Sequence, residues 1–425
     1  MCRAVRRVGV DAGATGLRPE RHGGAIVCAL VGFVASGPAV ASAQTVLGLA
    51  EVWALAREQA PQIVSTRLAV AEARGRLTGA SLRWSMNPEF DLNAGHRQGG
   101  TTRSMDLQLG ATQVFEPSAR RAARIAGATA HVDQSAATVE TTTREVLVDT
   151  SRLFYHAVYA AERVRLLTTS VDLARSIYEV ADRRFRAGDL AVLDVNVARA
   201  ALARVRSERD ATEAEQAVTL GALRALLGLD GPIALRGDLA LSAPPNVAAL
   251  TQAVEQRPEV RVLQAAIREA DADLAVAKTF TTPNYGVGLR YQREGGDHIV
   301  LGAFTVSLPL FSKGQELGTT GTARGARLRA ELDATRARVR IELESALAAY
   351  ERRVAAARVL ETEALPGLDD SDALTMRSFD AGQIGLPDVL LIRRELLDTR
   401  FQYLLAMFEA ALARVTVDAT AGVLR

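Results

Sequence analysis

Cysteine is nearly absent from the 425-residue sequence, since Cys2 and Cys28 are the only two and both lie within the first 43 residues. Beyond residue 43 the chain can form no disulfide, thiolate metal site or cysteine nucleophile. Histidine is also sparse there, and no two histidines have the i,i+3 or i,i+4 spacing of a helical metal site. They are His96, His131, His156 and His298. We expect no metal ion held by this chain.

Motifs of catalytic sites are missing as well. The sequence has no Gly-rich phosphate loop, no G-x-S-x-G and no H-E-x-x-H. Acidic pairs such as Asp369-Asp370 fit a solvated helix surface better than a catalytic dyad. No run beyond residue 43 is long and apolar enough for a transmembrane helix. We therefore expect neither an enzyme nor a bound cofactor.

The formal net charge is only +2, and the excess of positive charge lies at the N-terminus. The arginines there are Arg3, Arg6, Arg7, Arg18 and Arg21. The rest of the chain is close to neutral, so nucleic-acid binding has no electrostatic support. An apolar stretch at 25–34 and the small-residue site Ala41-Ser42-Ala43 follow, which predicts an export signal over residues 1–43. A single transmembrane anchor is the alternative, and the poor lipobox before Cys28 argues against lipid anchoring.

Three landmarks occur twice in the same order, at a nearly constant offset of about 195 residues. FRAGDLAVLDV at 185–195 corresponds to FDAGQIGLPDV at 379–389, QAPQI at 59–63 to QRPEV at 256–260, and Phe115 to Phe311. An internal duplication explains all three correspondences. We predict a first repeat over 44–230, a linker rich in proline and glycine over 231–245, and a second repeat over 246–425.

Each repeat reads as a helix, a β-hairpin, a very long helix and a returning helix. Residues 46–86 have helical spacing, with a break or kink at Pro61. A period of two around a Gly-Gly loop then predicts hairpins near 90–111 and 285–310. Aromatic residues at the strand ends suit a membrane interface, whereas a soluble hairpin on a core is the alternative. In the second hairpin, one face is assigned to lipid; it holds Val300, Phe304, Val306 and Leu308.

The helices that follow the hairpins are unusually long. Residues 117–184 contain one glycine, Gly127, and no proline after Pro117, which predicts a helix of about 100 Å. Residues 312–378 are similar, with an interruption at Pro366-Gly367. Small residues on several faces favour a helix with neighbours on two sides. Gly188 and Gly382 are predicted left-handed C-caps, after which helices over 193–227 and 388–417 run back.

These motifs resemble the TolC family of outer-membrane efflux proteins over residues 46–423. The resemblance rests on the two glycine-turn motifs and on the strand-to-helix junctions QVFEPSARRAAR at 113–124 and LPLFSKGQ at 308–315. The first junction is most similar to the heavy-metal resistance branch of the CzcC and CusC type.

The resemblance implies a mixed α and β membrane protein in the outer membrane with a periplasmic helical extension. Each chain of a homotrimer would give four strands to a twelve-stranded β-barrel and its helices to a periplasmic α-helical barrel. The trimer would act as a passive exit duct for metal ions or small toxic compounds, joined by a periplasmic adaptor (membrane fusion protein) to an inner-membrane pump of the resistance-nodulation-division (RND) type. A periplasmic coiled-coil adaptor or scaffold is the alternative, but it leaves the two hairpins unexplained.

The resemblance also implies roles for residues of the two glycine turns. Phe185, Gly188, Phe379 and Gly382 would form the tips that dock on the adaptor, whereas an ordinary helix C-cap is the alternative for the glycines. Asp194 and Asp388 would place carboxylates at the pore entrance and favour cations, or else only cap the returning helices.

The chain departs from the family pattern around this entrance. Phe379 and Ile384 stand where polar or basic partners would help to lock a closed state, and Leu391 stands where a second acidic residue could occur. We expect a gate held by fewer polar contacts.

Overall fold

The computed structural model describes residues 45–99, 102–241, 243, 245–254 and 256–424. The predicted export signal, with Cys2 and Cys28, lies outside these residues. The elements of the first half are β1 Thr45–Leu47, α1 Leu49–Gln59, α2 Pro61–Ser81, β2 Glu89–Gly99, β3 Thr102–Phe115, α3 Ser118–Ala187, α4 Val192–Leu227 and β4 Ile233–Leu235. Those of the second half are α5 Val247–Val254, α6 Pro258–Thr279, β5 Asn284–Glu294, β6 Asp297–Ser307, α7 Gln315–Val359, a π-helical turn Leu360–Ala364, α8 Leu368–Asp380 and α9 Leu386–Ala421.

The predicted first helix is two helices, as Pro61 requires. Ala60 has an extended ψ of 123°, and Pro61 opens α2 at a position where its missing N–H costs no helical hydrogen bond. Helix α2 ends at Ser81, earlier than the predicted boundary near residue 86. Leu82 turns extended with ψ at 133°, so the chain leaves the helix before it reaches Asn87-Pro88.

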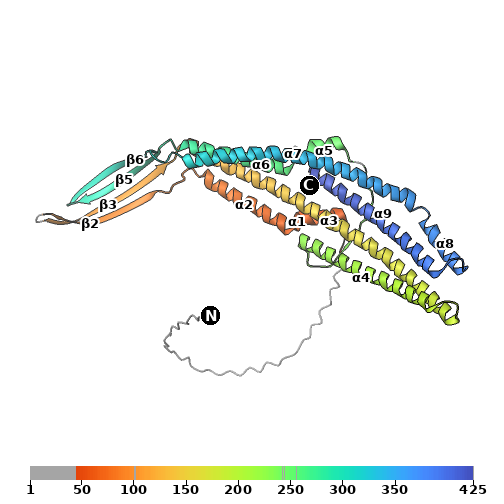
Figure 1. The fold of residues 1–425 in the computed structure, drawn as a ribbon. Helices are drawn as coiled ribbons and strands as arrows, with labels where there is room; N and C mark the ends of the chain where they lie inside the picture. The colour runs from red at the N-terminus through yellow and green to blue at the C-terminus, as the bar shows by residue number, and fades with distance from the viewer. Residues whose placement is uncertain (1–44, 100–101, 242, 244, 255, 425) are drawn as a thin grey trace, which may run out of the picture. The chain divides into compact units, whose positions relative to one another are not determined.

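Helix α3 is continuous over 70 residues, which confirms the long helix and corresponds to about 105 Å. It contacts α1, α2, α4, α6 and α9 along its length (Figure 1). The corresponding helix of the second half is broken, as expected at Pro366-Gly367, but the π-helical turn already begins at Leu360. Its start is at Gln315 rather than 312, because Gly314 adopts a left-handed φ of 78°. Of the helices described, none is both long and apolar enough to cross a membrane.

The four long strands form one antiparallel sheet in the order β2-β3-β5-β6 (Figure 1). The two hairpins are joined through β3 and β5, whose register pairs Leu109 with Tyr291. Across the whole sheet one row runs Leu92, Leu109, Tyr291 and Val300. Strands β2 and β6 are the edges, and neither has a second partner strand among the described residues.

The register separates the sheet into an apolar and a polar face, because side chains alternate along each strand. The apolar face carries Phe90, Leu92, Leu107, Leu109, Tyr285, Val287, Leu289, Tyr291, Val300, Phe304 and Val306. The opposite face carries Asp91, Asn93, Arg97, Asp106, Gln108, Thr112, Arg290, Gln292 and Thr305. Phe90 is 79% exposed and Phe304 68%, so the apolar face is uncovered in the single chain.

The strand that returns in the second hairpin is shorter than predicted. Strand β6 ends at Ser307, and Pro309 then removes a donor that a further ladder bond would need. Leu308 therefore lies beyond the strand, and the predicted common face applies within β6 to Val300, Phe304 and Val306.

Arginines at the start of α3 connect the sheet to the ends of α6 and α2 through hydrogen bonds. Arg120 donates to Asn284 Oδ1 at 2.8 Å, to Thr279 O at 2.9 Å and to Thr282 O at 3.2 Å, and its guanidinium lies 4.6 Å from the ring centroid of Phe280. Thr279 is the last residue of α6 and Thr282 lies just beyond it, where a helix leaves carbonyl acceptors unsatisfied. Arg121 does the same for α2, donating to Ser81 O at 2.6 Å.

A hydrophobic core lies where α1, α3, α4 and α9 meet. Val52, Leu147 and Leu227 are fully buried there, and Phe154 is nearly so. The predicted linker contributes to it, which sequence patterns did not indicate. Strand β4 pairs in parallel with β1, and Ile233 packs into the core.

Replacing Arg120 by Met should lower the free energy of unfolding by about 1.5–3 kcal/mol, because the carbonyls at the end of α6 lose a charged donor while the apolar stem is kept. Urea unfolding followed by circular dichroism measures the change. Arg152→Met is the matched control, since Arg152 is 54% exposed and has only a 3.6 Å pair with Asp149. Equal stability of the two variants would show that the junction does not depend on Arg120.

Candidate functional site: two helical tips and an arginine-lined cavity

The two glycine turns have the same backbone geometry. Gly188 has a φ of 87° and Gly382 a φ of 71°, which confirms the predicted left-handed conformation. At the first turn, Gly188 N donates to Phe185 O at 2.9 Å, and Asp189 N donates to Arg184 O at 2.9 Å. The second turn repeats both bonds with Phe379 O and Ser378 O as acceptors. The duplicated motif therefore closes two helical hairpins in one way.

The two tips pack against each other within one chain. A hydrophobic cluster joins α3 and α4 to α8 and α9; its buried members are Ile177, Ala181, Val195, Ala198, Phe379, Leu386 and Val389. The Arg184 guanidinium lies 4.7 Å from the centroid of the Phe379 ring and 4.0 Å from the Asp380 carboxylate. An apolar contact and a cationic contact thus hold the tips together.

The two phenylalanines of the motif have different environments. Phe185 is 40% exposed, whereas Phe379 is 2% exposed because it fills the cluster between the tips. Phe185 and the two glycines are accessible to a partner, but Phe379 can act on a docking surface only by supporting it. Ile384 also packs against this cluster, so two of the three apolar departures from the family pattern make contacts within the chain, whereas Leu391 is 66% exposed.

The two aspartates occupy the third position of their helices but differ in their contacts. Asp388 Oδ2 accepts a hydrogen bond from Gly385 N at 3.2 Å, which caps the start of α9. Helix α4 has no side-chain cap of this kind, and Asp194 is half-buried. The capping alternative therefore applies to Asp388 and leaves the Asp194 carboxylate without that role.

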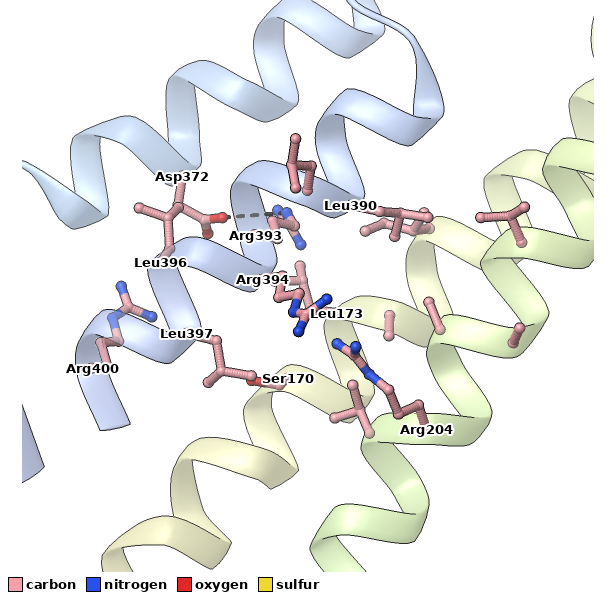
Figure 2. Close-up of a pocket in the computed structure, with 17 residues that line it drawn as sticks. Ser170, Leu173, Arg204, Asp372, Leu390, Arg393, Arg394, Leu396, Leu397 and Arg400 are labelled. Atoms are coloured by element: carbon pink, nitrogen blue, oxygen red, sulfur yellow. Dashed lines mark ion pairs between the residues drawn. The ribbon is translucent and has the colours of Figure 1, made fainter. Parts of the chain in front are cut away.

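A cavity of about 470 Å³ lies behind the tips, between α3, α4 and α9 (Figure 2). Its walls are largely apolar, with Leu173 and Ile177 from α3 and Leu390 and Leu397 from α9. Four arginines reach it, and Asp372 is the only acidic residue among those lining it. The arginines are Arg204, Arg393, Arg394 and Arg400.

Arg393 is a largely buried cation. Its side chain is 10% exposed, and its Nε lies 3.3 Å from Asp372 Oδ1 (Figure 2). Burial lowers the pKa of the Arg393 guanidinium below its ordinary value, and the Asp372 carboxylate opposes that shift. Nε and one terminal nitrogen are buried and make no hydrogen bond within the described residues.

Sequence reasoning did not identify this cavity, although the duplication contained a signal. Tyr178 and Arg199 stand at the spacing from Asp372 and Arg393 that separates Gly188 from Gly382. In the first repeat Arg199 stacks on the Tyr178 ring at 5.6 Å, whereas in the second a buried arginine faces an aspartate. Comparing the repeats position by position would have marked Asp372 as the altered position, because Arg393 matches Arg199 whereas Asp372 stands where the first repeat has Tyr178.

Metal-ligating residues do not gather anywhere in the described part of the chain: it holds no group of three or more His, Cys, Asp or Glu placed to bind a metal ion. The tips and the cavity offer apolar contacts, backbone turns and arginines. Such groups suit docking and anion binding rather than bond-breaking chemistry.

The chain is similar in sequence to outer membrane efflux proteins. Residues 52–229 match the family model for "Outer membrane efflux protein". The cobalt-zinc-cadmium resistance protein CzcC of Cupriavidus metallidurans is 26% identical over 327 residues, covering 76% of this chain and 78% of that protein. The nickel-cobalt-cadmium resistance protein NccC of Alcaligenes xylosoxydans is 26% identical over 316 residues, covering 73% and 69%.

Solved structures agree in fold. CusC superposes with a TM-score of 0.75 at 15% identity, covering 88% of this chain and 91% of that chain. The CmeC outer membrane channel of Campylobacter jejuni superposes with a TM-score of 0.70 at 17% identity, covering 88% and 85%. The chain is therefore similar in sequence to outer membrane efflux proteins, with CzcC and NccC among its relatives, and it shares the fold of CusC. These homologues are channels rather than enzymes.

The cap difference between the tips can be measured by amide hydrogen exchange. Asp388→Ala should speed exchange in the first turn of α9 about three- to fivefold, because the Gly385 N–H loses its acceptor. Asp194→Ala is the matched control and should change exchange in the first turn of α4 by less than about twofold. A similar acceleration in both would mean that the helix dipole, and not the cap, is the common cause.

Proposed function

We propose that the protein is the outer-membrane exit channel of a tripartite efflux system. One observation carries the proposal: a four-stranded sheet has an apolar face, a polar face and two unpaired edges, and it leads into paired helical hairpins. An exposed apolar face of this extent needs an apolar environment.

Unpaired edges cannot remain in lipid, where no water satisfies backbone groups. Adjacent strands of the sheet are antiparallel throughout, so β6 of one copy can pair antiparallel with β2 of the next. The strands have 11 or 14 residues, enough to cross a bilayer when tilted. We propose a homotrimer with a twelve-stranded barrel, as the resemblance to the TolC family implies. The apolar face would contact lipid and the polar face would line the lumen.

The helical hairpins would extend the duct into the periplasm and present the tips Phe185, Gly188 and Gly382 to a periplasmic adaptor, with Phe379 holding them in place. An inner-membrane RND-type pump would supply the energy. The names of the CzcC and NccC relatives favour metal ions as the cargo over other small toxic compounds. Residues 1–43 would direct export. The repeats 44–230 and 246–425 would form the wall of the duct, joined by the linker over 231–245.

Asp194 and Asp388 would place carboxylates near the pore entrance. Asp194→Asn tests this most cleanly, because its carboxylate forms no helix cap. Single-channel recordings should show a reduced preference for cations, and an unchanged preference would exclude Asp194 from the pore.

Mass measurement tests the assembly. Purified protein in a mild detergent should have the mass of three chains by light scattering, corrected for detergent, and should migrate differently in gels before and after boiling. A folded species with the mass of one chain would contradict the channel. A soluble periplasmic fraction would favour the adaptor or scaffold.

Phe304→Arg should reduce the amount of heat-resistant assembly in outer membranes. An arginine on the lipid face near mid-bilayer costs about 2–4 kcal/mol. Ala303→Arg is the control, because Ala303 lies beside Phe304 on the polar face. If Ala303→Arg assembles poorly and Phe304→Arg assembles normally, the faces are assigned the wrong way round.

Gly382→Val should assemble normally but lose most of its efflux activity. Valine opposes the left-handed φ of 71°, so the turn that the adaptor meets changes its shape. Gly385→Ala, three residues on, keeps an ordinary φ of −80° and should retain activity. Resistance of a deletion strain that carries each variant gives the measurement, and full resistance with Gly382→Val would exclude this tip from docking.

A further inference from the structure

The cavity behind the tips has an imbalance of charge that its own residues do not remove. Arg204 comes from α4 and Arg393 and Arg394 from α9, against Asp372 from α8 (Figure 2). Arg394 has a weak pair outside the lining, 3.7 Å from Asp398. Arg204 and Arg394 are exposed, but Arg393 is largely buried, so water screens its charge less and an anion beside it would be attracted more strongly.

Arg393 shows where such an anion would bind. Its side chain is nine-tenths buried; Nε faces Asp372 Oδ1 at 3.3 Å, whereas the terminal nitrogen Nη1 has no hydrogen-bond acceptor among the described residues. A buried charged donor without an acceptor costs more than a neutral one. A planar oxyanion matches the fork of a guanidinium and can accept two parallel hydrogen bonds.

The apolar lining and the volume of the cavity determine what organic group the bound anion carries. Leucine, isoleucine, valine and alanine side chains supply most of the remaining lining. Its volume of about 470 Å³ falls within the range of small-molecule sites. A hydrated inorganic anion would leave this apolar surface in contact with water, whereas an organic anion would cover it.

We propose that the cavity between α3, α4 and α9 binds a small organic anion, a carboxylate carried on an apolar ring or chain. The carboxylate accepts hydrogen bonds from Arg393, Arg204 adds a second positive charge from the opposite wall, and the apolar body lies among the leucines of α9 and the apolar side chains of α3. The site is independent of the proposed efflux function, because it is formed within one chain.

A matched pair of ligands tests the proposal. The full protein in neutral maltoside detergent is titrated by calorimetry with 2-naphthoate and with 2-naphthamide, which has the same ring without the charge. Naphthoate should bind at least about tenfold more tightly than naphthamide, since a charged hydrogen bond is replaced by a neutral one.

Three variants locate the binding. Arg393→Gln should weaken naphthoate binding about ten- to a hundredfold and leave naphthamide nearly unchanged. Arg204→Gln leaves the Arg393–Asp372 pair intact and should weaken naphthoate binding up to about fivefold, so it provides a test if Arg393→Gln folds poorly. Arg175→Gln is the control, because Arg175 is a 50% exposed arginine of α3 outside the cavity, and it should bind as the unmodified protein does.

Equal binding of the two ligands would overturn the proposal, as would naphthoate binding that neither Arg393→Gln nor Arg204→Gln changes. Failure of the unmodified protein to bind naphthoate would overturn it as well. An acidic side chain of a neighbouring molecule found in the cavity of the assembled protein would assign the arginines to an interface instead.

Discussion

One continuous backbone hydrogen-bond ladder, from Ser118 to Ala187, determines the position of most other elements. Strand β3 ends at Phe115, immediately before this helix, and the Gly188 turn follows its last residue. Helices α1, α2, α4, α6 and α9 all contact it. Buried alanines such as Ala130, Ala137 and Ala160 let neighbouring helices approach α3 closely. The sheet, the core and the tips are therefore placed relative to one another by a single helix rather than by a succession of loops.

The duplicated halves use equal sequence positions for different purposes. Phe185 is partly exposed at one tip, whereas its counterpart Phe379 is buried between the two tips and covered by Arg184. The first half has one unbroken long helix, but the second has a π-helical turn followed by Gly367 with a φ of 88°. The two halves have similar hairpins, and the differences arise where one hairpin packs on the other.

Local features of the sequence predicted most of the fold. The break at Pro61, the two hairpins and the left-handed glycines follow from steric rules that act within a few residues. Features that depend on distant partners were not predictable in this way. The pairing of β1 with β4 needs a parallel partner far along the chain, and Phe379 looks like Phe185 until the second hairpin packs beside it. The site was predicted to the same extent: the turns were located, but the arginine-lined cavity was not, because its lining comes from α3, α4, α8 and α9.

The length of α3 restricts how the chain can change in evolution. One inserted residue would rotate everything beyond it by about 100°, so buried alanines would face outward and charged residues inward. Only insertions or deletions near whole multiples of the repeat, such as about seven or eleven residues, return the same side chains to the same neighbours. A change in α3 must also be matched in the helices that run beside it, since α4 and α6 contact it along its surface. The distance from sheet to tip in this fold can therefore change only in steps set by the helical repeat, and in several helices together.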